Sequence, residues 1–364
     1  MKSLTVLGFA AILLTTSCAT PSGPPAEAVP PSYTSMAGEI PVGVIPAGSL
    51  RDAERDRRLE LSIDYPAREG SYPVVVFVTG FGAPSRSYVG LSSYWASHGY
   101  VVIKVGHPES RPDVTDLAEV WRDQTPAEWR SRARDISLVI DSFTQLEQQY
   151  PELKGKMDPA RIGVGGHSYG AFTTMLLAGA RTFDGVTAAT YADARVRASL
   201  AMSPQGPGER GGLTTESWRE VRIPTMYMTG TADRGVTEEE DETWRRQAFE
   251  LSPPGDKWFV SLGGAGHFAF AGRLVMPEAI ETTEPAVPSD PRDPRDPRTR
   301  GPLLPTERTA VRRVDAGFYS DRARMNVIRT VALAFWDAYL KDEAAGREYL
   351  SALSTRGDMT VESK

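Results

Sequence analysis

Short runs dominated by apolar residues alternate with amphipathic runs over most of the chain. They lie at 72–78, which is continuously apolar, and at 99–105, 196–204, 223–230 and 257–262, with a further run that begins at 161. A strand that is apolar on both faces is typical of a parallel sheet covered by helices on each side. The pattern therefore predicts an α/β fold with a mostly parallel central sheet and helices on both faces.

Several segments between and after these strands carry apolar residues at helical spacing. They span 88–98, 129–150, 171–180 and 325–340. Ile136, Val139 and Ile140 recur at the spacing of one helix face, so 129–150 is expected to be a single crossover helix. Residues 58–66 instead alternate between apolar and polar side chains, which predicts a half-exposed strand near an antiparallel edge of the sheet.

Residues 1–18 have the pattern of an export signal. Lys2 precedes an apolar run at 4–14 that is too short to cross a bilayer, and Cys18, the chain's only cysteine, follows it. The arrangement resembles a bacterial lipoprotein signal, although Thr15 stands where such signals usually have leucine. We expect an exported protein, anchored to a membrane of the bacterial cell envelope through a lipid on Cys18. The alternative is ordinary signal cleavage after Ala19, which would give a secreted or periplasmic protein.

Proline-rich composition marks two segments that are not expected to join the core. Residues 19–37 are rich in Pro, Ser, Gly and Ala and are expected to be a tether, so that a single domain extends over 38–364. Within that domain, 276–313 is expected to be an insertion, because Asp-Pro-Arg occurs three times in succession at 290–298. Proline at every third position opposes both helix and central strand. The insertion is either a disordered surface excursion or a flap over the site.

Composition narrows the class of protein. At 364 residues and 40% hydrophobic content, the chain can bury one large core. Its net charge of −6, without a sustained basic run, argues against nucleic acid as a partner. With one cysteine, no disulfide can form within the chain. The sequence specifies no oligomeric state.

The segment Gly166-His167-Ser168-Tyr169-Gly170 lies between a predicted strand and a predicted helix. In a Gly-x-Ser-x-Gly turn the backbone is crowded two residues before and two residues after the serine, and glycine relieves that crowding. The turn lifts the serine hydroxyl clear of the sheet, at the N-terminus of a helix whose dipole favours a developing negative charge. Ser168 is therefore the candidate nucleophile, and Gly166 and Gly170 are the glycines that its turn requires.

An acid and a histidine follow Ser168 in the order that such a nucleophile needs. Asp233 lies in the turn after strand 223–230, from where it can orient a histidine and stabilise the imidazolium that forms. His267 lies in a glycine-rich loop after strand 257–262, and it is the one histidine of four that follows both the serine and the acid. We expect His267 to act as general base and Asp233 to orient it.

Backbone N–H groups at two turns are candidates for an oxyanion hole. Strand 72–78 ends in the glycine turn Thr79-Gly80-Phe81-Gly82, from which an N–H can point at the carbonyl oxygen under attack. We expect the N–H groups of Phe81 and Tyr169 to be the two donors. The alternative is a turn that only connects two elements.

The sequence suggests minor roles for four further residues. His107 is expected in a loop near the mouth of the site, and no cluster of further ligands suggests a metal there. Asp241 falls in an acidic run that we interpret as a solvated helix face. Tyr88 and Trp218 are candidates for the walls of a substrate pocket.

From about residue 51 to 350 the chain resembles the α/β-hydrolase superfamily, nearest to dienelactone-hydrolase-like serine enzymes and their relatives, the platelet-activating-factor acetylhydrolases and bacterial polyester hydrolases. The matching segments are Tyr65-Pro66, Val78-Thr79-Gly80-Phe81-Gly82, Ser97-His98-Gly99-Tyr100, Gly166-His167-Ser168-Tyr169-Gly170, Thr229-Gly230-Thr231-Ala232-Asp233 and Gly266-His267. Dienelactone hydrolases carry cysteine where Ser168 stands, so their specific activity is not implied. The acetylhydrolases take their acid one strand earlier, where this chain has Met202-Ser203-Pro204, so their phospholipid substrate is not implied either.

The resemblance implies an α/β-hydrolase fold and a serine hydrolase that cleaves carboxylic esters, small or polymeric, through Ser168, His267, Asp233 and an acyl-enzyme. It implies no cofactor and no metal. Two alternatives stay open. One is a peptidase or amidase with the same three residues, and the other is a non-catalytic surface lipoprotein that uses the fold as a binding module.

Overall fold

The computed structural model describes residues 33–107, 125–185, 187–208, 210–235, 239–271, 305–353, 355 and 358–364, with only the backbone at 210 and 305–322. The chain divides into the units Met1–Pro30 and Pro31–Lys364, and the described residues belong to the second. The predicted export signal with Cys18, most of the predicted tether and the Asp-Pro-Arg repeats lie outside the described residues.

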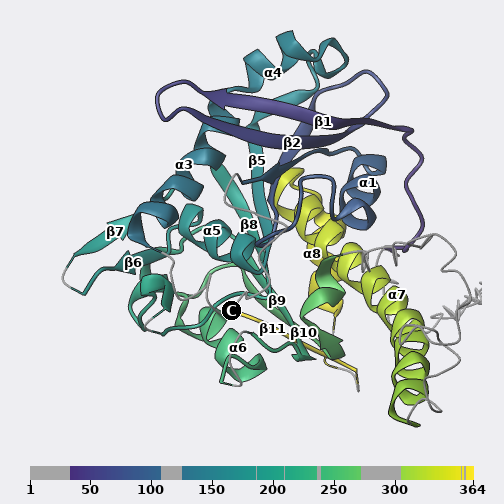
Figure 1. The fold of residues 1–364 in the computed structure, drawn as a ribbon. Coiled ribbons are helices and arrows are strands. Elements are labelled where there is room, and N and C mark those ends of the chain that lie inside the picture. The colour runs from purple at the N-terminus through teal and green to yellow at the C-terminus, as the bar shows by residue number, and fades with distance from the viewer. Residues whose placement is uncertain are drawn as a thin grey trace, which may run out of the picture. The chain divides into compact units, whose positions relative to one another are not determined.

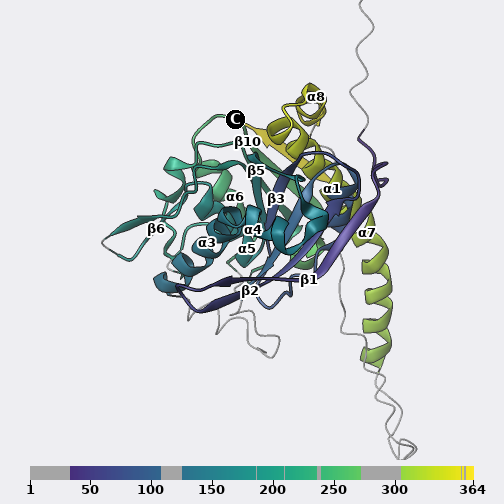
Figure 2. The ribbon, with the colours of Figure 1, turned by 90° about the horizontal axis from the view of Figure 1, so that it is seen from above.

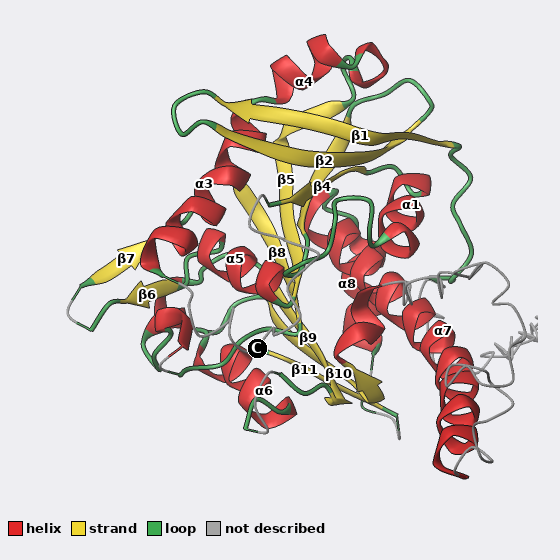
Figure 3. Cartoon of the chain, in the orientation of Figure 1, coloured by secondary structure: helices red, strands yellow, loops and turns green. Residues whose placement is uncertain are grey.

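A mixed β-sheet organises the described part of the chain (Figures 1 and 3). Its nine strands, counted over that part, lie in the order β1-β2-β4-β3-β5-β8-β9-β10-β11. The strands from β4 to β10 in this order pair in parallel, whereas β1, β2 and β11 run antiparallel to their neighbours. The strands span Val42–Asp52 (β1), Arg57–Pro66 (β2), Tyr72–Val78 (β3), Val101–Gly106 (β4), Met157–His167 (β5), Val196–Met202 (β8), Thr225–Ala232 (β9), Lys257–Gly266 (β10) and Met359–Ser363 (β11), and Arg181–Phe183 (β6) and Ala188–Thr190 (β7) form a separate hairpin.

Helices cover both faces of this sheet (Figure 2). They span Val89–Ser97 (α1), Pro126–Asp141 (α3), Phe143–Gln149 (α4), Tyr169–Leu177 (α5), Glu242–Leu251 (α6), Pro305–Leu340 (α7) and Ala344–Ala352 (α8). In β3, Val75 and Phe77 pack in the cluster that includes α1 and α7, while Val74 and Val76 pack in the cluster that includes α3. Because side chains alternate along a strand, one apolar strand contributes to both cores. The expected α/β architecture is confirmed.

Some element boundaries differ from those predicted. The expected single helix 129–150 is two helices, because the chain turns at Ser142 between α3 and α4. α3 begins three residues early at Pro126, where Thr125 and Glu128 form a capping box. Strand β1 was not predicted, and its irregular pattern of buried and exposed residues explains why, since it contains a bulge. β11 and α8 were also not predicted.

Helix α7 begins at Pro305, well before the predicted start at 325. Residues 305–313, expected in the insertion, are therefore helical. Pro305 is the last proline of the chain, and proline is favoured in the first turn of a helix. Within the described residues, no helix has both the length and the apolar composition that a bilayer span requires.

Residues 33–37, expected to belong to the tether, pack against the domain. The ring of Tyr33 lies 4.8 Å from that of Tyr349, and the Tyr94 hydroxyl donates to the carbonyl oxygen of Thr34 at 2.6 Å. The packed chain therefore begins before the predicted boundary at 38. A composition-based boundary missed this contact because its two partners are aromatic residues far along the sequence.

Trp336→Ala should destabilise the domain. The Trp336 side chain is fully buried on α7, and a Cβ at Gly163 of β5 would lie 2.7 Å from its ring. Removing so large a core side chain costs about 3–5 kcal/mol. Urea unfolding should show a loss of this size, whereas Val327→Ala, at a position 38% exposed on the same helix, should change stability by less than about 0.5 kcal/mol. Equal losses in both variants would contradict this account of the core.

Candidate active site

Ser168 occupies a strained turn between β5 and α5. Its φ of 57° and ψ of −120° lie where residues other than glycine are rarely found. The Ser168 N–H donates to the carbonyl oxygen of Met202 at 2.9 Å, and its own carbonyl oxygen accepts from Phe172 N at 3.1 Å and from Gln205 Nε2 at 3.0 Å. These bonds hold the backbone in its strained conformation, with the half-buried serine as the N-cap residue of α5.

Two glycines make this turn possible. A Cβ on Gly166 would lie 2.4 Å from the carbonyl oxygen of Gly170, and a Cβ on Gly170 would lie 2.0 Å from the carbonyl oxygen of Val78. Both distances are shorter than real Cβ atoms approach oxygen, so any larger residue would displace backbone. The contact at Gly170 also brings the first turn of α5 against the end of β3.

Parallel strand pairing brings Asp233 and His267 to the edge of the sheet where Ser168 lies. β9 pairs with β10 so that Ala232 lies opposite Gly266. Asp233 and His267 directly follow these two strands. Ser168 directly follows β5, which is parallel to both within the same sheet. The carboxyl ends of parallel strands meet at one edge, so three residues far apart in sequence become neighbours.

A hydrogen-bonded chain joins the three side chains. The His267 Nδ1–H donates to Asp233 Oδ1 at 2.8 Å, since an ionised carboxylate can only accept. Nε2 of the same ring is then unprotonated, and it accepts from the Ser168 hydroxyl at 2.9 Å. The arrangement can transfer a proton from the hydroxyl to the imidazole while the carboxylate holds the tautomer.

Asp233 is completely buried, and its carboxylate is enclosed by donors. Thr229 Oγ1 donates to Oδ2 at 3.0 Å, and Arg245 Nε lies 3.1 Å from Oδ1. Burial alone would raise the pKa of Asp233, but the hydrogen bond from His267 and the charge of Arg245 outweigh it and hold the pKa below its usual range. The carboxylate is therefore ionised wherever the imidazole can act as a base.

The acidic run before α6, expected to be a solvated helix face, is solvated only in part. The partly exposed Asp241 is the N-cap of α6 and accepts from Trp244 N at 3.0 Å. Glu240, in the same acidic run, is buried. Arg245, for which the sequence reasoning had no role, contacts Asp233. Its helical spacing gave no signal, because an arginine on an amphipathic helix is usually exposed.

The two turns expected to supply oxyanion donors lie side by side. Phe81 follows β3 and Tyr169 is the first residue of α5, and their ring centroids are 6.5 Å apart. The buried Arg132 of α3 contacts both turns. Its guanidinium lies 4.0 Å from the centroid of the Tyr169 ring and donates to the carbonyl oxygen of Thr79 at 3.4 Å.

His167, beside the serine, joins the first of these turns to the loop of His267. Its Nε2–H donates to the carbonyl oxygen of His267 at 2.8 Å, so Nδ1 must accept, and it does so from the Tyr88 hydroxyl at 2.9 Å. The Tyr88 oxygen in turn accepts from Gly80 N at 3.1 Å. Burial, with the nearby charge of His267, lowers the pKa of His167 to about 3, so the ring stays neutral.

Three residues lie elsewhere than the sequence indicated. His107 is not at the mouth of a site, because it is buried and its Nδ1 hydrogen-bonds to Asp135 Oδ2 at 2.9 Å. Tyr88 is 3% exposed and Trp218 is fully buried, so neither forms an open pocket wall. Loop positions and core positions cannot be told apart for isolated aromatic residues, because both favour large side chains.

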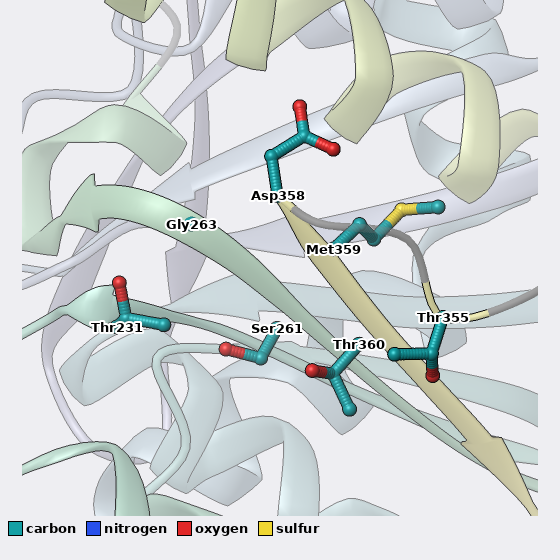
Figure 4. A pocket seen from close by; sticks show the side chains of 7 residues that line it. All are labelled: Thr231, Ser261, Gly263, Thr355, Asp358, Met359 and Thr360. Carbon is teal, nitrogen blue, oxygen red and sulfur yellow. The ribbon is translucent and has the colours of Figure 1, made fainter.

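A cavity of about 320 Å³ lies where β9, β10 and β11 meet (Figure 4). Its lining is Thr231, Ser261, Gly263, Thr355, Asp358, Met359 and Thr360. Ser168, Asp233 and His267 are not among these residues, so the cavity is separate from the hydrogen-bonded chain. Over the described ranges, no group of three or more His, Cys, Asp or Glu residues is placed to hold a metal ion.

Comparison with known proteins agrees with this architecture. The family model described as "Alpha/beta hydrolase family" matches residues 75–266, which is more than half of the chain. Cutinase est2 of Thermobifida alba is 24% identical over 212 residues, which are 57% of each protein. Cutinase cut1 of Thermobifida fusca is 25% identical over 211 residues, which are 57% of this chain and 53% of the relative.

A further relative is the bis(hydroxyethyl) terephthalate hydrolase of Streptomyces coelicolor, 25% identical over 176 residues, which are 47% of this chain and 44% of the relative. The chain thus spans about half the length of the curated relatives it matches.

Gly170→Ala should disrupt the turn that carries Ser168. The added methyl group would meet the carbonyl oxygen of Val78, which belongs to a central strand and cannot move aside. We expect a loss of at least about 2 kcal/mol in the free energy of unfolding. Gly208→Ala is the matched control, since nothing lies within 4 Å of a Cβ there. A Gly170→Ala protein as stable as the control would contradict the steric argument.

Proposed function

The chain belongs to the alpha/beta hydrolase family, and we propose that it is an exported serine hydrolase that cleaves carboxylic esters. The hydrogen-bonded chain from Asp233 through His267 to Ser168 carries this proposal. Its hydroxyl, imidazole and carboxylate have the order and the spacing of a nucleophile, a general base and an orienting acid.

Acylation begins when Ser168 Oγ attacks the ester carbonyl carbon and passes its proton to His267 Nε2. The carbonyl oxygen becomes an oxyanion, which the N–H groups of Phe81 and Tyr169 stabilise. The imidazolium is stabilised by Asp233, which stays ionised. When the tetrahedral intermediate collapses, the C–O bond to the alcohol breaks, and the alcohol oxygen takes the proton from Nε2.

Deacylation repeats these steps with water in place of the serine. His267 Nε2 takes a proton from the water as its oxygen attacks the acyl carbon. Collapse of the second intermediate breaks the bond to Ser168 Oγ, which regains a proton from Nε2. The carboxylic acid leaves, and the starting protonation states are restored.

The names of the relatives favour ester substrates of the polyester class. Of the three relatives named above, two are cutinases and one is named for a terephthalate ester. The half-buried Phe81, against the Tyr169 ring, and the 56% exposed Phe268, against the His267 ring, supply apolar surface on which an acyl group can pack. We infer a substrate that is a small or polymeric ester.

Two other functions are possible for the same architecture. A peptidase or amidase could use the same triad, and hydrolysis of amides but not esters would identify it. A non-catalytic surface lipoprotein would have no need for the hydrogen bonds that hold the hydroxyl, imidazole and carboxylate in sequence. This arrangement is the reason why we favour the enzyme.

Ser168→Ala should abolish ester hydrolysis and leave the fold intact. We expect kcat for p-nitrophenyl esters to fall on the order of 10⁴-fold or more, and labelling by a fluorophosphonate probe to disappear. Ser71→Ala is the matched control, because Ser71 is exposed before β3 and away from the triad. Activity of the Ser168→Ala protein within tenfold of the control would refute the nucleophile assignment. A series of esters from acetate to palmitate, with a matched amide, would then define the acyl preference.

We also propose that Cys18 carries a lipid that anchors the protein to a membrane of the cell envelope. Cys18→Ser should release the protein into the soluble fraction, because one acyl-bearing residue supplies the anchor and the following segment is proline-rich. Specific activity should not change. The measurement is membrane fractionation with an immunoblot, and unchanged membrane association of Cys18→Ser would favour ordinary signal cleavage.

A further inference from the structure

A buried arginine lies against the acid of the proposed triad. Arg245 belongs to α6, and the residue is 1% exposed. Arg245 Nε lies 3.1 Å from Asp233 Oδ1, the same oxygen that accepts from His267 Nδ1 at 2.8 Å. One carboxylate oxygen therefore faces both a permanent cation and the imidazole whose protonation the reaction requires.

The same guanidinium also fixes the loop that follows β8. Its NH1 group donates to the carbonyl oxygens of Ser203 at 3.1 Å and Pro204 at 3.0 Å. The next residue, Gln205, donates to the carbonyl oxygen of Ser168 at 3.0 Å. Arg245 is thus connected to the acid directly and to the nucleophile through one short loop.

The charges around Arg245 show that it is held there as a cation. Burial lowers its pKa, while the charges of Asp233, Glu240 and Asp241 oppose that shift. A buried guanidinium without such partners would be strongly unfavourable. Asp233 makes the largest of these opposing contributions, and the guanidinium donates hydrogen bonds to the carbonyl oxygens of Asp233, Ser203 and Pro204.

Two further ionisable side chains lie near His267 or near the end of the strand that leads to it. His167 of β5 lies with its ring centroid 4.7 Å away and is neutral, since its pKa is about 3. Arg324 of α7 is a cation, and its Nε donates at 3.0 Å to the carbonyl oxygen of Gly263 in β10, four residues before His267. The aromatic ring of Phe268 completes the surroundings. Asp233 Oδ1 is the carboxylate oxygen that contacts the imidazole, at 2.8 Å, and Arg245 is the cation that lies against that oxygen, at 3.1 Å.

We propose that Arg245 is a positioning residue that fixes the Asp233 carboxylate and, through its charge, sets the pH below which His267 takes up a proton and can no longer act as a base. This inference rests on the proposed function only for its catalytic consequence. A cation beside the carboxylate weakens the attraction between that carboxylate and an imidazolium. Removing that cation should therefore strengthen the attraction, so that the imidazole of such a variant takes up a proton more readily than the wild-type imidazole.

The sign of the effect separates this role from a merely structural one. If a neutral residue replaces Arg245 and Asp233 stays in place, the imidazolium gains stability, and the acidic limb of the kcat/KM profile moves to higher pH. If the replacement only lets Asp233 drift away, the imidazolium loses its partner, and the same limb moves to lower pH. A change in stability alone does not move this acidic limb in either direction.

The test is a pH titration of the His267 ring in the full chain, with the NMR signals of the imidazole nitrogens as the readout. The chain has four histidines, and His267→Gln assigns the signal. Arg245→Gln should shift the midpoint upward by about one pH unit, on the scale that a neighbouring charge produces. Arg245→Met, which cannot donate to the carbonyl oxygens of Ser203 and Pro204, should shift it in the same direction. Arg245→Lys keeps the charge and should restore the midpoint to within about 0.3 unit.

Arg246→Met is the matched control. Arg246 is the next residue of α6, but it pairs with Glu250 at 2.7 Å and with Glu362, away from the triad. The titration midpoint of His267 in the Arg246→Met protein should equal that in the wild type. Because the titration needs no substrate, it gives its answer even if the protein does not cleave esters, and kcat/KM profiles of the same variants report the catalytic consequence separately. An unchanged or lowered midpoint in folded Arg245→Gln and Arg245→Met proteins would overturn the proposal.

Discussion

The contact between Gly170 and the carbonyl oxygen of Val78 is the constraint on which the rest of the site depends. It presses the first turn of α5 against the end of β3, at a distance where no Cβ can fit. Ser168 is consequently held at a φ of 57° and points away from the sheet. The same contact brings the backbone that follows Ser168 against Val78 and Thr79, which lead into the turn of Phe81, so one steric condition acts on both turns that carry the proposed oxyanion donors.

Residues whose positions follow from local geometry could be placed from the sequence. Two glycines in the sequence indicate the turn at Ser168. Asp233 and His267 each follow an apolar strand, so parallel pairing brings all three residues to one edge of the sheet. The central sheet was predictable for the same reason, because its strands are apolar on both faces. β1 was not, since a bulge breaks its alternation of buried and exposed residues.

Residues whose roles depend on packing between distant elements could not be predicted. Arg245 looks like any polar residue of an amphipathic helix until α6 is docked beside β9, and His107 looks like a loop residue until α3 supplies Asp135. His167 lies in the motif itself, but its neutral state follows from burial between Tyr88 and the carbonyl oxygen of His267. A sequence pattern gives positions along one element and carries no information on which charges a second element will bring.

This difference reflects a division of roles between the sheet and the helices. The strands place Ser168, Asp233 and His267 through backbone register, which depends little on individual side chains. The helices on one face then supply the buried charges: α3 brings Arg132 against the Tyr169 turn, and α6 brings Arg245 against Asp233. Electrostatic interactions in a buried site are stronger than at the surface, so a single helix residue can change the titration of the triad without moving it. If Arg245 acts as we propose, the strands determine the geometry of the three residues, and a helix determines the pH range in which the imidazole can accept a proton.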